Sequence, residues 1–150
     1  MKKSLKTLAV LICAAFALCI TQCTKSPEDL IIGSWNMEDA VITQSYGDQS
    51  MTEHIGPEEN ETVVITFNKD NTLTQVETTV EDGITYTNTT RGTYTLVDNK
   101  VSFVWDDADE PQTYDIETLD KQDLVFTASE SGMVEGVLYT ATVKVYLKRQ

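Results

Sequence analysis

The chain has 150 residues, and its 24 acidic against 11 basic side chains give a net charge of −13 at neutral pH. Three lysines but no acids precede residue 23, so the remaining chain keeps eight basic and 24 acidic residues and a net charge of −16. A surface this negative repels phosphate groups, which argues against nucleic acid as a partner. All three cysteines, Cys13, Cys19 and Cys23, lie in this first segment, so we expect neither a disulfide nor a thiolate metal site in the folded part.

The first 22 residues have the features of an export signal. A segment with three lysines precedes an apolar run over residues 8–20, which is shorter than the roughly 20 residues of a membrane-spanning helix. Cys23 then ends the tetrapeptide Ile-Thr-Gln-Cys. This tetrapeptide resembles a lipobox, the short sequence that ends at the acylated cysteine of bacterial lipoproteins. We therefore expect a signal peptide over residues 1–22, lipidation at Cys23 and a short tether over 23–26. Acylation at Cys19, or ordinary secretion after Ala17, are the alternatives.

Acylation at this position would attach the protein to a membrane. Several acyl chains on one cysteine hold far more strongly than a single chain, because each buried methylene contributes about 0.8 kcal/mol. We expect a lipid anchor in the outer membrane of the cell envelope. The sequence leaves open whether the domain faces the periplasm or the cell surface.

A short helix is expected where the folded domain, residues 27–150, begins. Ser26 can cap the helix, Pro27 suits its first position, and two acids follow at the positive end of the helix dipole. Gly33 can end the helix. The pattern predicts a helix over residues 27–32.

The rest of the chain is rich in residues that favour strands. Alternating apolar positions and Asn, Asp and Gly turns predict eight strands: Ser34–Ser45, Thr62–Phe67, Thr72–Val80, Ile84–Val97, Lys100–Asp106, Gln112–Leu119, Asp123–Ser129 and Val137–Lys148. Gly92, inside the predicted strand at 84–97, suggests a bend or bulge in that strand. The stretches 46–61 and 130–136 are expected to be connections, the first of them a mobile flap at one end of the fold.

The short connections favour a closed sheet. Strands that follow each other through tight turns are usually antiparallel neighbours, and closing the sheet removes its edges. The predicted fold is therefore all-β, an eight-stranded antiparallel up-and-down barrel preceded by a short helix. A β-sandwich is the alternative, because the two longer connections could serve as crossovers.

Three phrases resemble the lipocalin-like domains of bacterial envelope lipoproteins. They are Gly33-Ser34-Trp35 at the start of the first strand, the hairpin at 65–73 and the segment at 92–101. The resemblance implies that Gly33 permits a tight entry and that Trp35 plugs the closed barrel end. It also implies that a cation of the last strand, Lys148 or Arg149, packs across the Trp35 indole, with a modest cation–π attraction in the case of Arg149.

The resemblance further implies a small apolar or amphipathic ligand in the barrel mouth. Aromatic residues on the predicted strands are the candidates for lining this site, namely Tyr86, Tyr94, Phe103, Trp105, Tyr114 and Tyr139. In a barrel of eight strands these side chains could also fill the interior themselves.

No catalytic set is apparent in the sequence. His54 is the only histidine, and no thiol follows Cys23 to complete a nucleophile and base pair. The acidic run at 106–110 lacks the spacing of an EF-hand, so we predict no metal and no cofactor. The leading interpretation is a non-enzymatic, lipid-anchored binding domain. The alternatives are an envelope protein-interaction module with a filled barrel, and a hydrolase or inhibitor that uses carboxylates.

Overall fold

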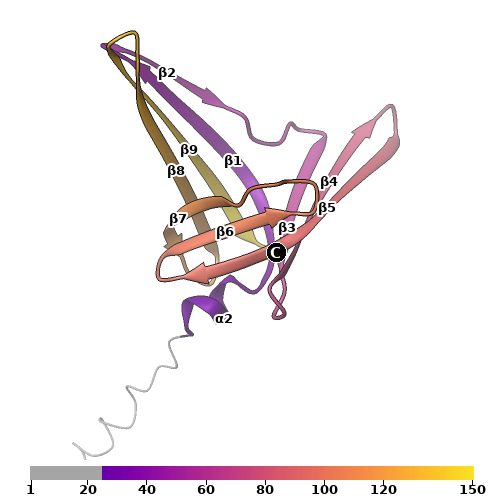
Figure 1. The fold of residues 1–150 in the computed structure, drawn as a ribbon. Helices are drawn as coiled ribbons and strands as arrows, with labels where there is room; N and C mark the ends of the chain where they lie inside the picture. Colours follow the sequence, from indigo (N-terminus) through magenta and orange to yellow (C-terminus); the bar gives the residue numbers. More distant parts are fainter. Residues whose placement is uncertain (1–24) are drawn as a thin grey trace, which may run out of the picture.

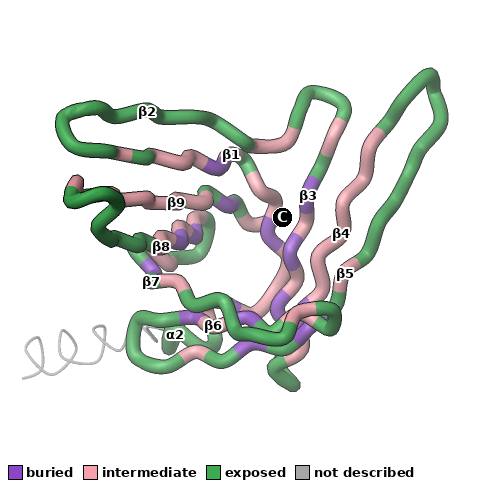
Figure 2. Tube along the Cα trace, turned by 45° about the horizontal axis from the view of Figure 1, so that its top comes forward, coloured by how far each residue is buried: buried purple, intermediate pink, exposed green. Residues whose placement is uncertain are grey.

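The computed structural model describes residues 25–150, which form one short helix and one antiparallel sheet. The elements in chain order are α2 (Pro27–Ile31), β1 (Gly33–Tyr46), β2 (Gln49–His54), β3 (Glu61–Phe67), β4 (Thr72–Glu81), β5 (Ile84–Val97), β6 (Lys100–Trp105), β7 (Gln112–Leu119), β8 (Asp123–Val134) and β9 (Val137–Arg149). The last strand, β9, pairs with β1 and closes a ring of eight strands, which Figure 2 shows from its open end. The predicted barrel is confirmed, and this closure excludes the sandwich.

Helix α2 forms where the sequence predicts it. The Ser26 hydroxyl accepts a hydrogen bond from the backbone N–H of Asp29 at 3.3 Å, and Pro27 occupies the first turn. The helix ends at Ile31, and Gly33 then opens β1 with φ at +130°. A residue with a Cβ atom rarely adopts such a φ, so glycine suits this sharp change of direction.

The prediction of a loop over residues 46–61 is wrong in its first half. Residues 49–54 form β2, which pairs with β1 across a turn at Gly47. Tyr46 lies opposite Gln49 at the turn, and Val41 lies opposite His54 at the other end of the pairing. All six residues of β2 are exposed, so no alternation of apolar and polar residues marks this strand in the sequence. Polar cross-strand contacts join it instead, including a hydrogen bond of 3.2 Å between the Ser45 and Ser50 hydroxyls.

Two further features differ from the prediction, the end of β8 and the expected bulge in β5. Strand β8 continues to Val134 and turns at Glu135 and Gly136, which both have positive φ, as a two-residue type I′ turn requires. No bulge occurs at Gly92, which pairs in register with both neighbouring strands. A Cβ atom there would lie 2.4 Å from the Val104 carbonyl oxygen, so the glycine permits close approach of β5 and β6. Among the described pairings, the register shifts lie in β1, at Met37–Asp39, and in β7, at Ile116–Thr118.

Strand β1 changes its partner along its length, and this leaves a gap in the barrel wall. Its first residues, Gly33–Asn36, pair with β3, whereas residues 41–46 pair with β2. The chain from Ile55 to Asn60 crosses between the end of β2 and the start of β3. The Ile55 N–H donates to the Ala40 carbonyl at 2.7 Å, which holds this segment, the 55–60 crossing, against β1.

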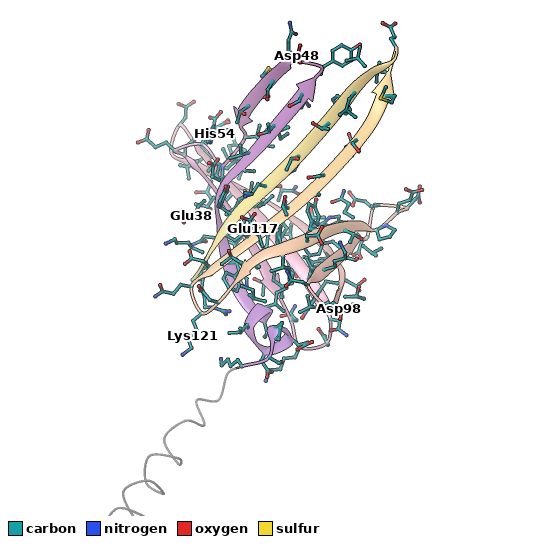
Figure 3. All side chains as sticks on the ribbon, turned by 90° about the vertical axis from the view of Figure 1, so that its left-hand side faces the viewer. Glu38, Asp48, His54, Asp98, Glu117 and Lys121 are labelled. Carbon is teal, nitrogen blue, oxygen red and sulfur yellow. The ribbon has the colours of Figure 1, made fainter. Side chains whose placement is uncertain are left out.

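The two ends of the barrel differ. Helix α2 lies at one end, and the hairpins β1–β2, β8–β9 and β4–β5 project at the other (Figure 1). In Figure 3, Asp48 marks the tip of the first hairpin and Lys121 lies near α2. The core lies toward the α2 end and consists of Ile31, Trp35, Ile65, Phe67, Leu73, Tyr94, Val101, Phe103, Ile116, Leu124, Phe126 and Leu147.

Candidate ligand-binding site

The α2 end of the barrel is closed by Trp35. This side chain is fully buried, and its indole N–H donates to the Ile31 carbonyl of α2 at 2.8 Å. The guanidinium carbon of Arg149 lies 4.1 Å from the centroid of the indole ring. This distance is within the range of a cation–π contact.

Arg149 also ties the last strand to the helix end. Its guanidinium donates to the Ile32 carbonyl at 2.9 Å, to the Lys121 carbonyl at 2.9 Å and to the Leu30 carbonyl. The bonds to Leu30 and Ile32 satisfy backbone acceptors that the end of the short helix leaves without internal partners, and the bond to Lys121 reaches the connection between β7 and β8. Gly33 makes room for this arrangement, because a Cβ atom there would lie 2.6 Å from Arg149 Nη1. Lys148, the alternative to Arg149, instead pairs with Asp123 on the surface at 3.6 Å.

A cavity of about 520 Å³ occupies the other half of the barrel interior and opens toward solvent. This volume is within the range of small-molecule sites. Apolar and aromatic side chains make up most of its wall, with a smaller number of polar and acidic groups. The lining residues are Met37, Ile55, Gly56, Pro57, Glu61, Val63, Ile65, Gln75, Glu77, Thr90, Phe103, Trp105, Asp107, Gln112, Tyr114, Phe126 and Val145.

Three of the six aromatic residues that the sequence proposes as lining lie in this cavity. Phe103 lies between Trp105 and Tyr114 in tilted ring contacts, with ring centroids 6.0 and 5.4 Å away. Burial raises the pKa of the Tyr114 phenol above its ordinary value, because the charged phenolate is poorly solvated there. Phe126 extends the cluster, with its centroid 5.5 Å from that of Phe103. These four rings form one continuous aromatic wall.

The other three predicted lining residues lie elsewhere. Tyr94 is buried in the core toward the α2 end, in edge-to-face contact with Phe67, and its hydroxyl donates to the Asn68 carbonyl at 2.9 Å. Tyr86 is 53% exposed on the projecting β4–β5 hairpin. Tyr139 lies beside Tyr46 in a shallow groove between the projecting strands. The position of each ring along its strand thus decides whether it lines the cavity, although all six rings belong to strands with alternating patterns.

Sequence reasoning missed the polar part of the lining. Gln75 and Glu77 face inward because they share a face of β4 with buried Leu73, just as Glu61 shares a face of β3 with buried Val63. The period-2 pattern therefore contained a signal for them. No such signal existed for Ile55 and its neighbours, which reach the cavity only because the 55–60 crossing fills the gap beside β1.

Acidic groups are the charged part of the cavity wall. Glu77 accepts a hydrogen bond of 2.7 Å from the Gln75 amide, and Glu61 accepts one of 3.4 Å from the Glu58 N–H. Exposed Asp107 adds a third carboxylate. Within residues 25–150, none of these three forms an ion pair, and no lysine or arginine lines the cavity.

Several sequence-based expectations concern other parts of the chain. His54 pairs with Asp39 at 2.8 Å on the surface. Over residues 25–150, no group of three or more His, Cys, Asp or Glu side chains is arranged to hold a metal ion, and no helix has the length and apolar character to cross a membrane. The expected signal peptide and the lipidation site Cys23 lie outside the described residues.

The chain was compared with known proteins. Residues 31–126 match the family model of the lipocalin-like domain. The fold is similar to crystal structures of a lipocalin-like protein from Bacteroides uniformis (17% identity, covering 80% of this chain and 98% of that chain, TM-score 0.48) and of an uncharacterized protein from Bacteroides eggerthii (12% identity, 80% and 99%, TM-score 0.49). No curated protein matches the chain. Because the family model spans well over half of the sequence, this chain belongs to the family of lipocalin-like domain proteins.

Proposed function

We propose that this protein is a non-enzymatic binding protein that holds a small hydrophobic or amphipathic molecule in the open half of its barrel. The observation that carries the proposal is the cavity of about 520 Å³ with its wall of Phe103, Trp105, Tyr114 and Phe126. Large, mostly apolar cavities with a few polar groups are typical of small-molecule sites. Lipocalin-like folds commonly bind small hydrophobic ligands, which supports the same function.

A matched pair of variants on β3 tests this proposal. Val63 is buried and lines the cavity, whereas its neighbour Val64 points to the opposite face of the strand. Val63→Phe adds a ring inside the cavity, and Val64→Phe adds the same ring outside it. We expect a panel of lipids and envelope metabolites, scored by thermal shift and native mass spectrometry, to contain a ligand whose binding only Val63→Phe reduces. A panel without any binder, or equal losses in both variants, would contradict the proposal.

We further propose that the barrel is attached to the outer membrane through acyl chains on Cys23. The lipobox-like sequence supports this, and so does the position of the first described residues beside α2, at the end opposite the cavity (Figure 1). An anchor at this end would direct the cavity away from the bilayer. Metabolic labelling with an alkyne-bearing palmitate should mark the exported protein and the Cys19→Ser variant but not Cys23→Ser. Labelling of Cys23→Ser would contradict this attachment.

A second function is favoured by exposed apolar side chains on the projecting hairpins. Tyr46 is 41% exposed, Met51 59% and Val134 50%, and the strand registers place these residues of β1, β2 and β8 on one face of the sheet. Exposed apolar side chains near one another can mark a surface that contacts another protein. Crosslinking in intact cells tests this alternative, an envelope interaction module. It requires a crosslinked partner that is lost when Tyr46, Met51 and Val134 are changed together to serine.

A further inference from the structure

The inner face of the barrel becomes steadily more polar from the α2 end to the mouth. Along β3 the inward residues are Phe67, Ile65, Val63 and finally Glu61. Along β4 they are Leu73, Gln75 and Glu77. The deep positions are therefore apolar, and both strands carry a carboxylate where they approach the mouth.

The two carboxylates are close neighbours on the sheet. Glu77 lies directly opposite Val63, and Glu61, two residues before Val63, lies opposite Thr79. The two glutamates are thus diagonal neighbours on one face of adjacent strands, a position in which long side chains can reach each other. Two negative charges so placed repel each other and create a negative potential at the mouth.

The groups that contact these carboxylates leave their charge uncompensated. Glu77 accepts from the amides of Gln75 at 2.7 Å and Asn88 at 3.4 Å, and both donors are neutral. In the part of the chain that the structure describes, the ion pairs of Lys100, Lys144 and Lys148 engage other acids. Arg91 follows the lining residue Thr90, but it is exposed on the opposite face of β5 from buried Gly92.

The aromatic wall adds a second preference for positive charge. Trp105 lies at the mouth end of β6 and lines the same cavity as Glu77. The face of an indole ring attracts an ammonium group, more strongly when water is excluded. A carboxylate or phosphate at this position would meet the negative charges of Glu61 and Glu77, and no positively charged side chain lines the cavity within residues 25–150.

Building on the proposed binding function, we infer that the ligand is an amphipathic cation. Its apolar part lies on the rings of Phe103, Tyr114 and Phe126, and its amine or quaternary ammonium group lies at the mouth between Glu61, Glu77 and Trp105. The cavity selects against anionic amphiphiles such as fatty acids of the same length, because no lining side chain can neutralise their charge.

Three probes with the same tail and different heads test the inference: decyltrimethylammonium, decanol and decanoate. Titration calorimetry on the full chain, below the concentrations at which the probes form micelles, gives their dissociation constants. We expect the cation to bind about tenfold or more tightly than decanol, as for one charge-assisted contact, and decanoate to bind most weakly.

The high overall negative charge of the protein requires a matched control. The double variant Glu61→Gln, Glu77→Gln should lose the preference for the cation and keep its affinity for decanol. The double variant Glu38→Gln, Glu130→Gln changes the net charge equally at exposed positions and should keep the preference.

The outcomes separate the inference from the proposed function. Binding of decanol that Val63→Phe abolishes, together with decanoate binding as tightly as the cation, would overturn the inference and leave the binding function standing. An equal loss of cation preference in both double variants would also overturn the inference, because the preference would then reflect net charge. Absence of binding by all three probes would count against the binding function, and the inference would fail with it.

Discussion

The two ends of this barrel are formed by the same strands, yet one is packed and the other is open. At the α2 end, Trp35 fills the interior and Arg149 satisfies the carbonyls around it. At the mouth, β1 leaves β3 to pair with β2, and only the 55–60 crossing covers the gap. A strand whose alternate residues face inward can therefore line either a packed core or an open cavity. What decides is whether a neighbouring element supplies a side chain that fills the space.

The two tryptophans give the largest contrast between the ends. Trp35→Ala should cost about 3–5 kcal/mol of unfolding free energy, because it removes a fully buried ring and leaves an enclosed cavity. Trp105→Ala should cost clearly less, since its half-buried ring faces space that is already open. Urea denaturation of both variants measures the difference. Equal losses would mean that the mouth is as important for stability as the plug.

The last strand offers a second contrast, between neighbouring cations. Arg149→Ala should destabilise the protein by about 2–3 kcal/mol, because carbonyls of Leu30 and Ile32 lose their donor. Arg149→Lys should recover only part of this, since an ammonium lacks the forked geometry of the guanidinium. Lys148→Ala, which removes an exposed pair with Asp123, should change stability by about 1 kcal/mol or less. Denaturant midpoints of the three variants rank these effects.

Two glycines with positive φ separate backbone strain from crowding. Alanine meets a backbone penalty at both Gly33 and Gly136, and the penalty is larger at Gly33, because φ is +130° there and +81°, nearer the left-handed region, at Gly136. Only at Gly33 would the new methyl group contact Arg149, whereas nothing lies within 4 Å of it at Gly136. We expect Gly33→Ala to cost about 1–2 kcal/mol more, through lost Arg149 hydrogen bonds. This excess should shrink when both glycine variants are compared in an Arg149→Ala background, because only the backbone difference then remains.

The smallest expected effect concerns the alkaline limit of stability. The pKa of Tyr114 is higher in the folded than in the unfolded protein, because burial disfavours the phenolate. The stabilisation from keeping this phenol neutral is complete below the unfolded value of about 10 and is lost as the pH rises through the folded value. Tyr114→Phe should therefore lose less stability than the parent protein between about pH 8 and pH 11. An identical decline in both proteins would show that Tyr114 does not contribute.

The fold followed from the sequence wherever alternation and turn chemistry agreed. Helix α2 and the hairpin turns with positive φ at Asn71, Asp82 and Asp98 lie where Asn, Asp, Gly and Pro predict them. Strand β2 was missed because its pairing depends on backbone hydrogen bonds and hydroxyl contacts rather than on burial. The extension of β8 was missed for a related reason, since residues 129–134 are exposed.

The candidate site was predicted only in part. Phe103, Trp105 and Tyr114 line the cavity as proposed, whereas Tyr94 belongs to the packed end and Tyr86 and Tyr139 to the projecting hairpins. Aromatic identity identifies side chains that suit a pocket. Aromatic identity does not indicate where along a strand the packed core ends and the cavity begins.

By itself, the sequence determined the strand-rich class, the helix that opens the domain, the turns and the inward face of most strands, because these depend on local backbone preferences and on period-2 burial. Only the tertiary structure decided that Arg149 rather than Lys148 meets Trp35, and that the interior stays open beside Glu61 and Glu77. These features join residues far apart in the chain, and a pattern of neighbouring residues carries no information about which distant side chain fills a shared space.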